Sequence, residues 1–280
     1  MHALPFVLAL VSAAIMAPVV LRTLSEGGHT RANYRARQLP FPFGLLVLAA
    51  ALPTLVLLAL IERLASIQVL SSKLIPIGAY VFGVICLGLI DDAFGDRPGG
   101  SPGPRGWRGH GMATLRGELS TGTLKAVGSL GLALLVTDFM PLSTGRWLLA
   151  SAVLVLATNA FNLLDLRPGR ASKAFVLLGA GLTLGAMDLR PLWALGLFAA
   201  PALVAGLYDL RERAMLGDTG ANLLGALAGL WLVLTLSGTG QLLALTLLLA
   251  LTIYGELRSI SALIEKIPGL RALDSWGRPS

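Results

Sequence analysis

Three acidic motifs stand at the ends of apolar segments of this chain. They are Asp91-Asp92 in LGLIDDAFGD, Asp165 in TNAFNLLDLRPGR and Asp218 in MLGDTGAN. Hard divalent cations choose oxygen ligands, and phosphate groups need cationic neighbours such as Lys and Arg. If the three motifs meet in space, they predict a site for a metal ion and a diphosphate.

The composition predicts an integral membrane protein. Hydrophobic residues make up 55% of the 280 residues and charged residues only 13%, whereas a soluble domain of this size needs far more charge to cover its surface. The single cysteine, Cys86, cannot form an intrachain disulfide and so indicates no compartment, and nothing indicates zinc. In a membrane protein a net charge of +7 reports topology rather than nucleic-acid binding.

Nine apolar runs of roughly 17 to 20 residues are long enough to cross the hydrocarbon core. They are Ala3 to Leu21, Pro42 to Ile61, Leu74 to Ile90, Leu119 to Val136, Trp147 to Leu164, Ala171 to Met187, Leu192 to Tyr208, Gly220 to Leu236 and Gln241 to Leu257. The first has no Lys or Arg before it, so we expect a retained helix rather than a signal peptide. The predicted fold is an all-α polytopic bundle with about nine transmembrane helices.

The distribution of cations predicts the orientation of this bundle. Of 22 Lys and Arg residues, only Arg63, Lys73, Arg146 and Arg190 fall on one side, which leaves 22 − 4 = 18 for the other. Because cations in short loops stay in the cytoplasm, the N-terminus is expected outside and the C-terminus in the cytoplasm. All three acidic motifs would then face the cytoplasm.

We expect one transmembrane catalytic domain, residues 1–258, followed by a cytoplasmic interfacial tail, residues 259–280. In the tail, Ile260, Leu263, Ile264 and Ile267 recur at helical spacing until Pro268. The loop from Asp91 to Glu118 contains DRPGGSPGPRGWRGHG, which is too rich in Gly and Pro for a helix, and we expect it to be mobile.

Each motif also has a structural explanation. Asp91 and Asp92 fit a solvated helix end, and Asp218 fits an N-cap stabilised by the helix dipole. Asn159, Asn162 and Asp165 recur every third residue, which places them on one face about 120° wide that points into the bundle. That stripe is followed by the cations Arg167, Arg170 and Lys173, as a phosphate ester with a bound metal requires, but interhelical polar packing with topological anchors also accounts for it.

Taken together, the motifs resemble a known family. NYRARQLPFPFGL, LGLIDDAFGD, LSTGTLKA, TNAFNLLDLRPGRA and MLGDTGANLLGA follow one another in the order and spacing of the polyprenyl-phosphate N-acetylhexosamine-1-phosphate transferases. That superfamily includes phospho-N-acetylmuramoyl-pentapeptide transferase and the N-acetylglucosaminyl-1-phosphate transferases that start lipid-linked glycan synthesis. The resemblance extends from about Asn33 to the end of the eighth predicted span.

The resemblance implies a magnesium-dependent enzyme of cell-envelope glycan synthesis, with manganese as a substitute metal. A polyprenyl phosphate, usually undecaprenyl phosphate, would attack a UDP-sugar at the plasma membrane and release UMP. By motif position, the implied catalytic residues are Asp91, Asp92 and Asp218, with Asp218 and Asp92 as metal ligands. The expected substrate-binding residues are Asn159, Asn162, Asp165, Lys125, Arg167, Arg170, Arg116 and Arg35. A homodimer is a further partner that the sequence leaves open.

The chain departs from the family at one position that bears on the donor. Where family members carry a run like DGLDGLA, this chain has Asp165-Leu166-Arg167-Pro168-Gly169-Arg170-Ala171, so Pro168 replaces the second aspartate. A basic, often His-rich loop near the last helices is also missing, since the three histidines are His2, His29 and His110. Two other classes therefore stay open: a non-catalytic relative that binds polyprenyl phosphate, and a secondary transporter, whose coupling sites lie near the membrane midplane.

Overall fold

The computed structural model describes residues 2–71, 73–95 and 121–279, and within these ranges nine helices have 17 residues or more. They are α1 (Leu4–Glu26), α2 (Leu45–Ala65), α3 (Leu74–Phe94), α5 (Thr121–Asp138), α6 (Thr144–Leu164), α7 (Arg170–Ala186), α8 (Arg190–Leu210), α9 (Gly217–Thr235) and α10 (Gly238–Leu257). Each lies at one of the nine predicted segments. Arg116 and most of the predicted mobile loop fall outside the described residues.

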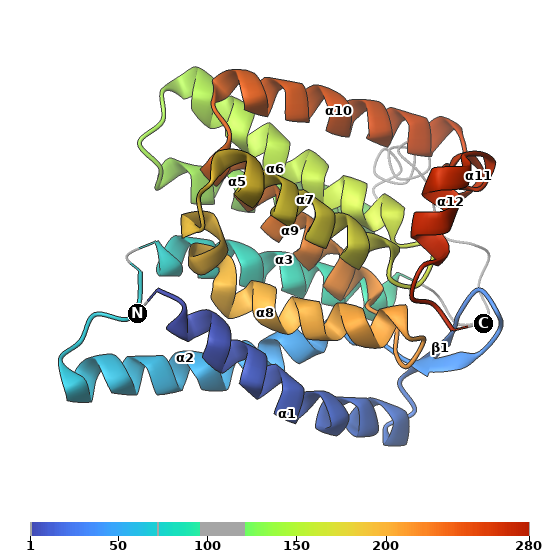
Figure 1. Ribbon diagram of the computed structural model, residues 1–280, viewed down its shortest axis with the longest axis horizontal. Coiled ribbons are helices and arrows are strands. Elements are labelled where there is room, and N and C mark those ends of the chain that lie inside the picture. The colour runs from blue at the N-terminus through green and yellow to red at the C-terminus, as the bar shows by residue number, and fades with distance from the viewer. Residues whose placement is uncertain (1, 72, 96–120, 280) are drawn as a thin grey trace.

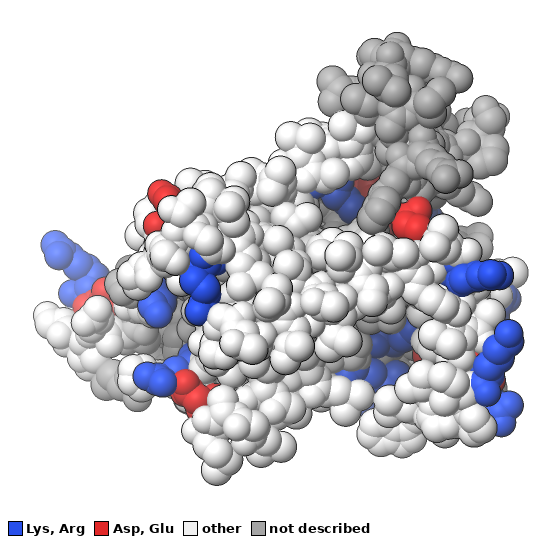
Figure 2. Space-filling view, turned by 90° about the horizontal axis from the view of Figure 1, so that it is seen from above, with Lys and Arg blue, Asp and Glu red and all other residues white. Residues whose placement is uncertain are grey.

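Among the residues that the structure describes, seven of these helices are long and apolar enough to cross a membrane: α1, α2, α3, α6, α8, α9 and α10. The prediction of nine spans is therefore confirmed for seven. Helix α7 has 17 residues, a rise of about 25 Å against a hydrocarbon core of about 30 Å, and α5 begins with the polar run TGTLK. The chain is a polytopic membrane helical bundle, and Figure 2 shows a broad uncharged region between the charged side chains near the two ends of one face.

Helix α9 lies at the centre of the bundle. Its residues are almost all buried, and it contacts α3, α6, α7 and α8 along its length. Glycines allow the close approach, since a Cβ built on Gly225 would lie 2.5 Å from Cα of Thr158 in α6. A residue at the start of α9 therefore belongs to the most buried of the seven candidate membrane spans.

The chain direction alternates from helix to helix, so one end of the bundle collects most of the polar elements (Figure 1). The C-terminal ends of α3 and α6 meet the N-terminal ends of α5, α7 and α9 there. A two-stranded antiparallel hairpin, β1 (Thr30–Ala32) and β2 (Gln38–Pro40), lies at the same end, with Thr30 opposite Pro40. So do two short helices, α11 (Ile260–Lys266) and α12 (Pro268–Ser275), and the C-terminus.

The tail differs from its prediction in one respect. The helical spacing that begins at Ile260 does form a helix, α11, and Ile260 is its buried residue. Pro268 does not end the helical tail, however, but begins α12. Proline is well tolerated in the first turn of a helix, because the N–H that it lacks has no intrahelical partner there.

Candidate functional site

Lys125 joins two of the acidic motifs at this end of the bundle. From the first turns of α5, its Nζ donates to Oδ2 of Asp91 in α3 at 3.0 Å and to Oδ2 of Asp218 in α9. The side chains of Lys125, Asp91 and Asp218 are 17%, 20% and 31% exposed. One partly buried ammonium therefore offsets the repulsion between two carboxylates that come from different helices.

Asn162 adds a fourth helix to this cluster. When its amide oxygen faces the ammonium, it accepts from Nζ of Lys125 at 3.0 Å, and its amide nitrogen donates to Oδ1 of Asp218 at 3.1 Å. The reverse orientation sets donor against donor, so the hydrogen-bond network fixes the orientation of the amide. We call Asp91, Lys125, Asn162 and Asp218 the lysine cluster.

Asp92 has a different task from its neighbour Asp91. Its Oδ1 accepts from the backbone N–H of Asp218 at 2.9 Å, and its Oδ2 accepts from the backbone N–H and the hydroxyl of Thr219 at 2.8 and 2.6 Å. The N-cap residue of α9, Leu216, has no side-chain cap of its own. Asp92 thus caps α9 from a neighbouring helix, and the capping role considered for Asp218 is corrected.

The first turn of α9 is also held by close backbone packing. Phe43 N–H donates to the Met215 carbonyl at 2.7 Å, and Gly44 N–H to the Leu216 carbonyl at 3.0 Å. On the α3 side, a Cβ built on Gly88 would lie 2.6 Å from the carbonyl oxygen of Asp218. The position of Asp218 is therefore set by the backbones of two other segments.

The polar stripe of α6 divides between three surroundings. Asn162 joins the lysine cluster, whereas Asn159 donates to the Thr252 hydroxyl of α10 at 3.3 Å, so helix packing accounts for Asn159. Asp165 follows the end of α6. Burial, and then the nearby carboxylates of Asp209, Asp218 and Asp92, raise the pKa of Asp165, while Arg170 acts in the opposite direction.

We expect Asp165→Asn to flatten the pH dependence of folding stability. Because the pKa of Asp165 is raised in the folded state, its contribution is fully present below the ordinary Asp value of 3.8 and is lost as the pH rises through the folded-state pKa. As the pH rises above about 4, the wild-type unfolding midpoint should therefore fall more than that of the variant. In Asp138→Asn, at the exposed last residue of α5, the unfolding midpoint should depend on pH as it does in the wild type. An equal pH dependence of the midpoint in all three proteins would contradict the prediction for Asp165.

Of the other predicted substrate-binding cations, the three that the structure describes have partners outside the lysine cluster. Arg170 pairs with Asp274 of α12, with 2.8 Å between Nε and Oδ1. Arg167 lies over the Tyr34 ring, 4.5 Å from its centroid, and 3.6 Å from Glu265. Arg35 lies 3.7 Å from the buried Glu212.

Sequence reasoning missed two acidic residues, Asp274 and Glu212, that pair with these cations. Besides its contact with Arg35, Glu212 accepts from Asn33 Nδ2 and from the Tyr34 hydroxyl, both at 3.2 Å, and so fastens the hairpin to the start of the α8–α9 connection. Glu212 lies 179 residues from Asn33, and Asp274 lies 104 residues from Arg170. No local periodicity connects residues so far apart.

The lysine cluster fits a magnesium ion only together with a phosphate ligand. Among residues 2–71, 73–95 and 121–279, no group of three or more His, Cys, Asp and Glu side chains is arranged to hold a metal ion. Magnesium is commonly bound by one or two carboxylates with substrate phosphates and water, and Asp91, Asp218 and the amide oxygen of Asn162 offer such a set. Asp92 fits less well as a ligand, since both its oxygens already accept hydrogen bonds from α9.

The arrangement can hold a metal cation and an anion side by side, because carboxylate and amide oxygens and one ammonium share a partly buried position at the ends of four helices.

Comparison of the chain with protein-family models and with curated protein sequences finds no match in either.

Proposed function

We propose that this protein transfers a sugar 1-phosphate, N-acetylhexosamine 1-phosphate being the expected case, from a UDP-sugar to a polyprenyl phosphate. The reaction takes place at the cytoplasmic face of the plasma membrane, releases UMP and serves cell-envelope glycan synthesis. The observation that carries the proposal is the lysine cluster, in which Lys125 is held by Asp91, Asp218 and Asn162. The order of the motifs supplies the substrate classes.

In the proposed reaction one phosphorus–oxygen bond forms and one breaks. An oxygen of the lipid phosphate attacks the phosphorus that bears the sugar, and the bridging oxygen leaves with its electron pair as part of UMP. The lipid phosphate is a monoester with a second pKa of about 6, so it is largely ionised at neutral pH. A strong general base is therefore not required, in agreement with the use of Asp92 as a helix cap.

The main barrier is electrostatic, because the lipid phosphate must approach a diphosphate of the same sign. Phosphate oxygens can take the place of the carboxylate oxygens around the Lys125 ammonium, which would then offset the charge of the reacting groups. When bound, magnesium, or manganese in its place, would be held by Asp218, Asp91 and Asn162 and would add Lewis-acid neutralisation of the diphosphate.

The position of the lysine cluster suits a reaction between a lipid and a water-soluble nucleotide. Asp91 lies in the last turn of α3, and Asp218 in the first turn of α9. Secondary transporters hold their coupling ions near the membrane midplane, so this position at the helix ends favours surface chemistry over transport. The excess of Lys and Arg at this end supports a cytoplasmic location.

The test is a lipid-linked product assay. Purified protein, undecaprenyl phosphate and magnesium are incubated with a panel of radiolabelled UDP-sugars, and we expect product with one UDP-N-acetylhexosamine. Asp92→Asn and Asp218→Asn should abolish it, while Asp138→Asn, at an exposed position at the other end of α5, should not. Absence of product with every donor, or full activity in both Asp92→Asn and Asp218→Asn, would overturn the proposal. Binding of undecaprenyl phosphate without turnover would identify the chain as a non-catalytic binder instead.

A further inference from the structure

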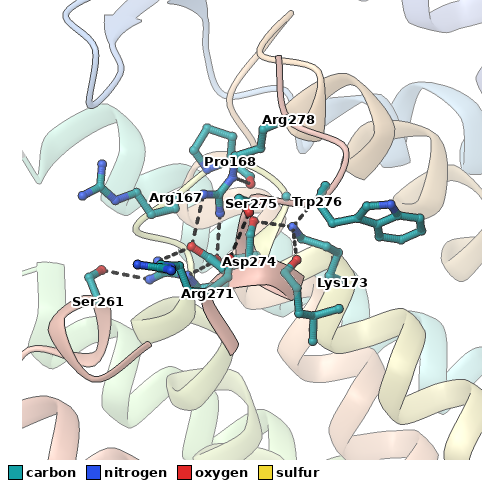
Figure 3. A network of polar contacts seen from close by, with 12 residues as sticks. Arg167, Pro168, Lys173, Ser261, Arg271, Asp274, Ser275, Trp276 and Arg278 are labelled. Atoms are coloured by element: carbon teal, nitrogen blue, oxygen red, sulfur yellow. Dashed lines mark hydrogen bonds and ion pairs between the residues drawn. The ribbon is translucent and has the colours of Figure 1, made fainter. Parts of the chain in front are cut away.

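The last residues of the chain are fastened to the polar end of the bundle by one carboxylate. We call residues 268–279 the tail segment. Asp274 accepts from Arg170 Nε and Nη2 at 2.8 and 3.1 Å, and from Arg278 Nη2 and Nη1 at 2.8 and 3.1 Å. The same carboxylate therefore makes two fork-like contacts with two guanidinium groups (Figure 3).

Other polar contacts complete the attachment. Lys173 Nζ donates to the carbonyl oxygens of Leu273, Asp274 and Trp276 at the C-terminal end of α12, where the helix dipole favours a cation. Arg278 Nε donates to the Pro168 carbonyl at 2.7 Å. The tail segment thus lies across the loop that joins α6 to α7.

Apolar burial contributes little to this attachment. Helix α12 has no buried residue, and Trp276 is 72% exposed. An apolar cavity of about 230 Å³ is lined by residues of α7 and α8 together with Leu273 and Trp276 of the tail segment, whereas well-packed protein contacts leave few voids of that size. The tail segment is therefore held by charged hydrogen bonds, which another anion can replace.

The attachment point lies at the same end of the bundle as the lysine cluster. Arg170 begins α7, eight residues after Asn162 of the lysine cluster and directly after the loop that the tail segment crosses. At its far end the tail segment reaches the hairpin, where Arg35 Nη2 donates to the Pro279 carbonyl at 3.2 Å. The tail segment consequently engages three cations at this end of the bundle, Arg170, Lys173 and Arg35.

We propose that the tail segment is an autoinhibitory lid, in which the Asp274 carboxylate occupies a phosphate-binding position on Arg170 and is displaced by a phosphate-bearing ligand. A phosphate presents the same paired oxygens to a guanidinium as a carboxylate does. The three oxygen atoms that the Arg170 side chain donates to, two of Asp274 and the Ser261 hydroxyl at 2.9 Å, all belong to residues after α10. Arg170 thus exchanges one anionic partner for another.

The charge of Asp274 persists at physiological pH. Burial acts to raise the pKa of Asp274, but hydrogen bonds from Arg170 and Arg278 outweigh it and lower the pKa to about 2. A lowered pKa means that the contact is fully present above the ordinary value of 3.8 and is lost as the pH falls toward about 2. Acidification within the physiological range therefore does not open the lid, and a competing anion is required.

The first test is hydrogen exchange of the backbone amides of the tail segment, measured by mass spectrometry on the full chain in nanodiscs of neutral lipid. Asp274→Asn should speed exchange at least about tenfold, since hydrogen bonds to charged groups contribute factors of that order. Glu265→Gln is the matched control, because this exposed carboxylate belongs to α11 and lies outside the Asp274 contacts. Equal protection of the tail segment in wild type and Asp274→Asn would overturn the proposal.

The second test adds phosphate ligands to the wild type. Inorganic pyrophosphate or UDP should accelerate exchange in the tail segment, and phosphatidic acid in the nanodisc tests a lipid source for the same chemistry. Faster exchange in the tail segment with a soluble phosphate or with phosphatidic acid supports the lid, and the source that accelerates exchange identifies the ligand class. No acceleration by any of the three ligands would contradict displacement.

The affinity for the ligand that accelerates exchange distinguishes a displaceable lid from a fixed tether. Asp274→Asn should bind it about tenfold more tightly than the wild type or Glu265→Gln, because the competing carboxylate is gone. Equal or weaker binding would show that Asp274 only anchors the chain and would overturn the proposal. The inference rests on the proposed function only for the identity of the ligand. Sugar-phosphate transfer without tail release would refute the lid alone, and tail release without transfer would refute the transferase alone.

Discussion

Replacing Asp218 with Asn is expected to lower the rate of sugar-phosphate transfer by on the order of a thousandfold, the scale set by removal of a preorganised electrostatic group. Asp218 accepts from Lys125 and, with Asp91, supplies the negative charge that would hold a divalent cation. The amide keeps the shape of the side chain and removes its charge. Initial rates of lipid-linked product formation at saturating UDP-sugar measure the effect.

Two comparisons make this result specific. Asp138→Asn changes the same chemical group at the opposite end of α5, and its rate should stay within about twofold of the wild type, since exposed surface substitutions have small effects. The unfolding temperature of Asp218→Asn should also stay close to that of the wild type, because Asp92 and not Asp218 caps α9. A rate for Asp218→Asn above one tenth of the wild-type rate would remove Asp218 from the proposed machinery.

Gly88→Ala is expected to destabilise the protein and to abolish transfer together. The added Cβ would lie 2.6 Å from the Asp218 carbonyl oxygen and 2.7 Å from Thr219 Cα, and these are backbone atoms that cannot rotate away. Overpacking of this kind typically costs about 1 to 3 kcal/mol, which outweighs a gain of at most about 1 kcal/mol from the higher helix propensity of Ala. To relieve the contact, the first turn of α9 must move and carry Asp218 away from Lys125.

Gly131→Ala in α5 is the matched control for this substitution. It makes the same chemical change in a helix, but a Cβ at Gly131 meets no atom within 4 Å, so stability should be unchanged or slightly higher. Thermal unfolding can be followed by the reactivity of Cys86, the single thiol of the chain. If both variants unfold at the same temperature and retain activity, the tight packing of α9 is not what positions Asp218.

The positions of the helices could be predicted from the sequence because a bilayer imposes long apolar runs. The ends of the helices could not, and at the site this mattered. The third span was expected to end at Ile90, whereas α3 continues to Phe94 and so contains Asp91 and Asp92. Adjacent residues of a helix point about 100° apart, which explains why Asp91 faces Lys125 while Asp92 faces the start of α9.

Interactions between distant segments could not be predicted from local pattern. Arg170 and Asp274 are 104 residues apart, and nothing in the spacing of either connects them. The hairpin was also missed, since its strands have three residues each and are too short to show alternation. By contrast, Asn162 was selected correctly as an inward-facing residue because the three-residue period of the α6 stripe is a local property of a helix.

The fate of the two phosphorus atoms of the donor tests the central claim most directly. UDP-N-acetylhexosamine labelled with ³²P at the phosphorus that bears the sugar is incubated with the purified wild-type protein, undecaprenyl phosphate and magnesium, and the lipid and aqueous phases are counted separately. The proposed reaction transfers the label to the lipid together with the sugar and releases one unlabelled UMP for each labelled lipid. Release of labelled UDP, or an unlabelled lipid phase with every donor tested, would contradict a transfer of sugar 1-phosphate.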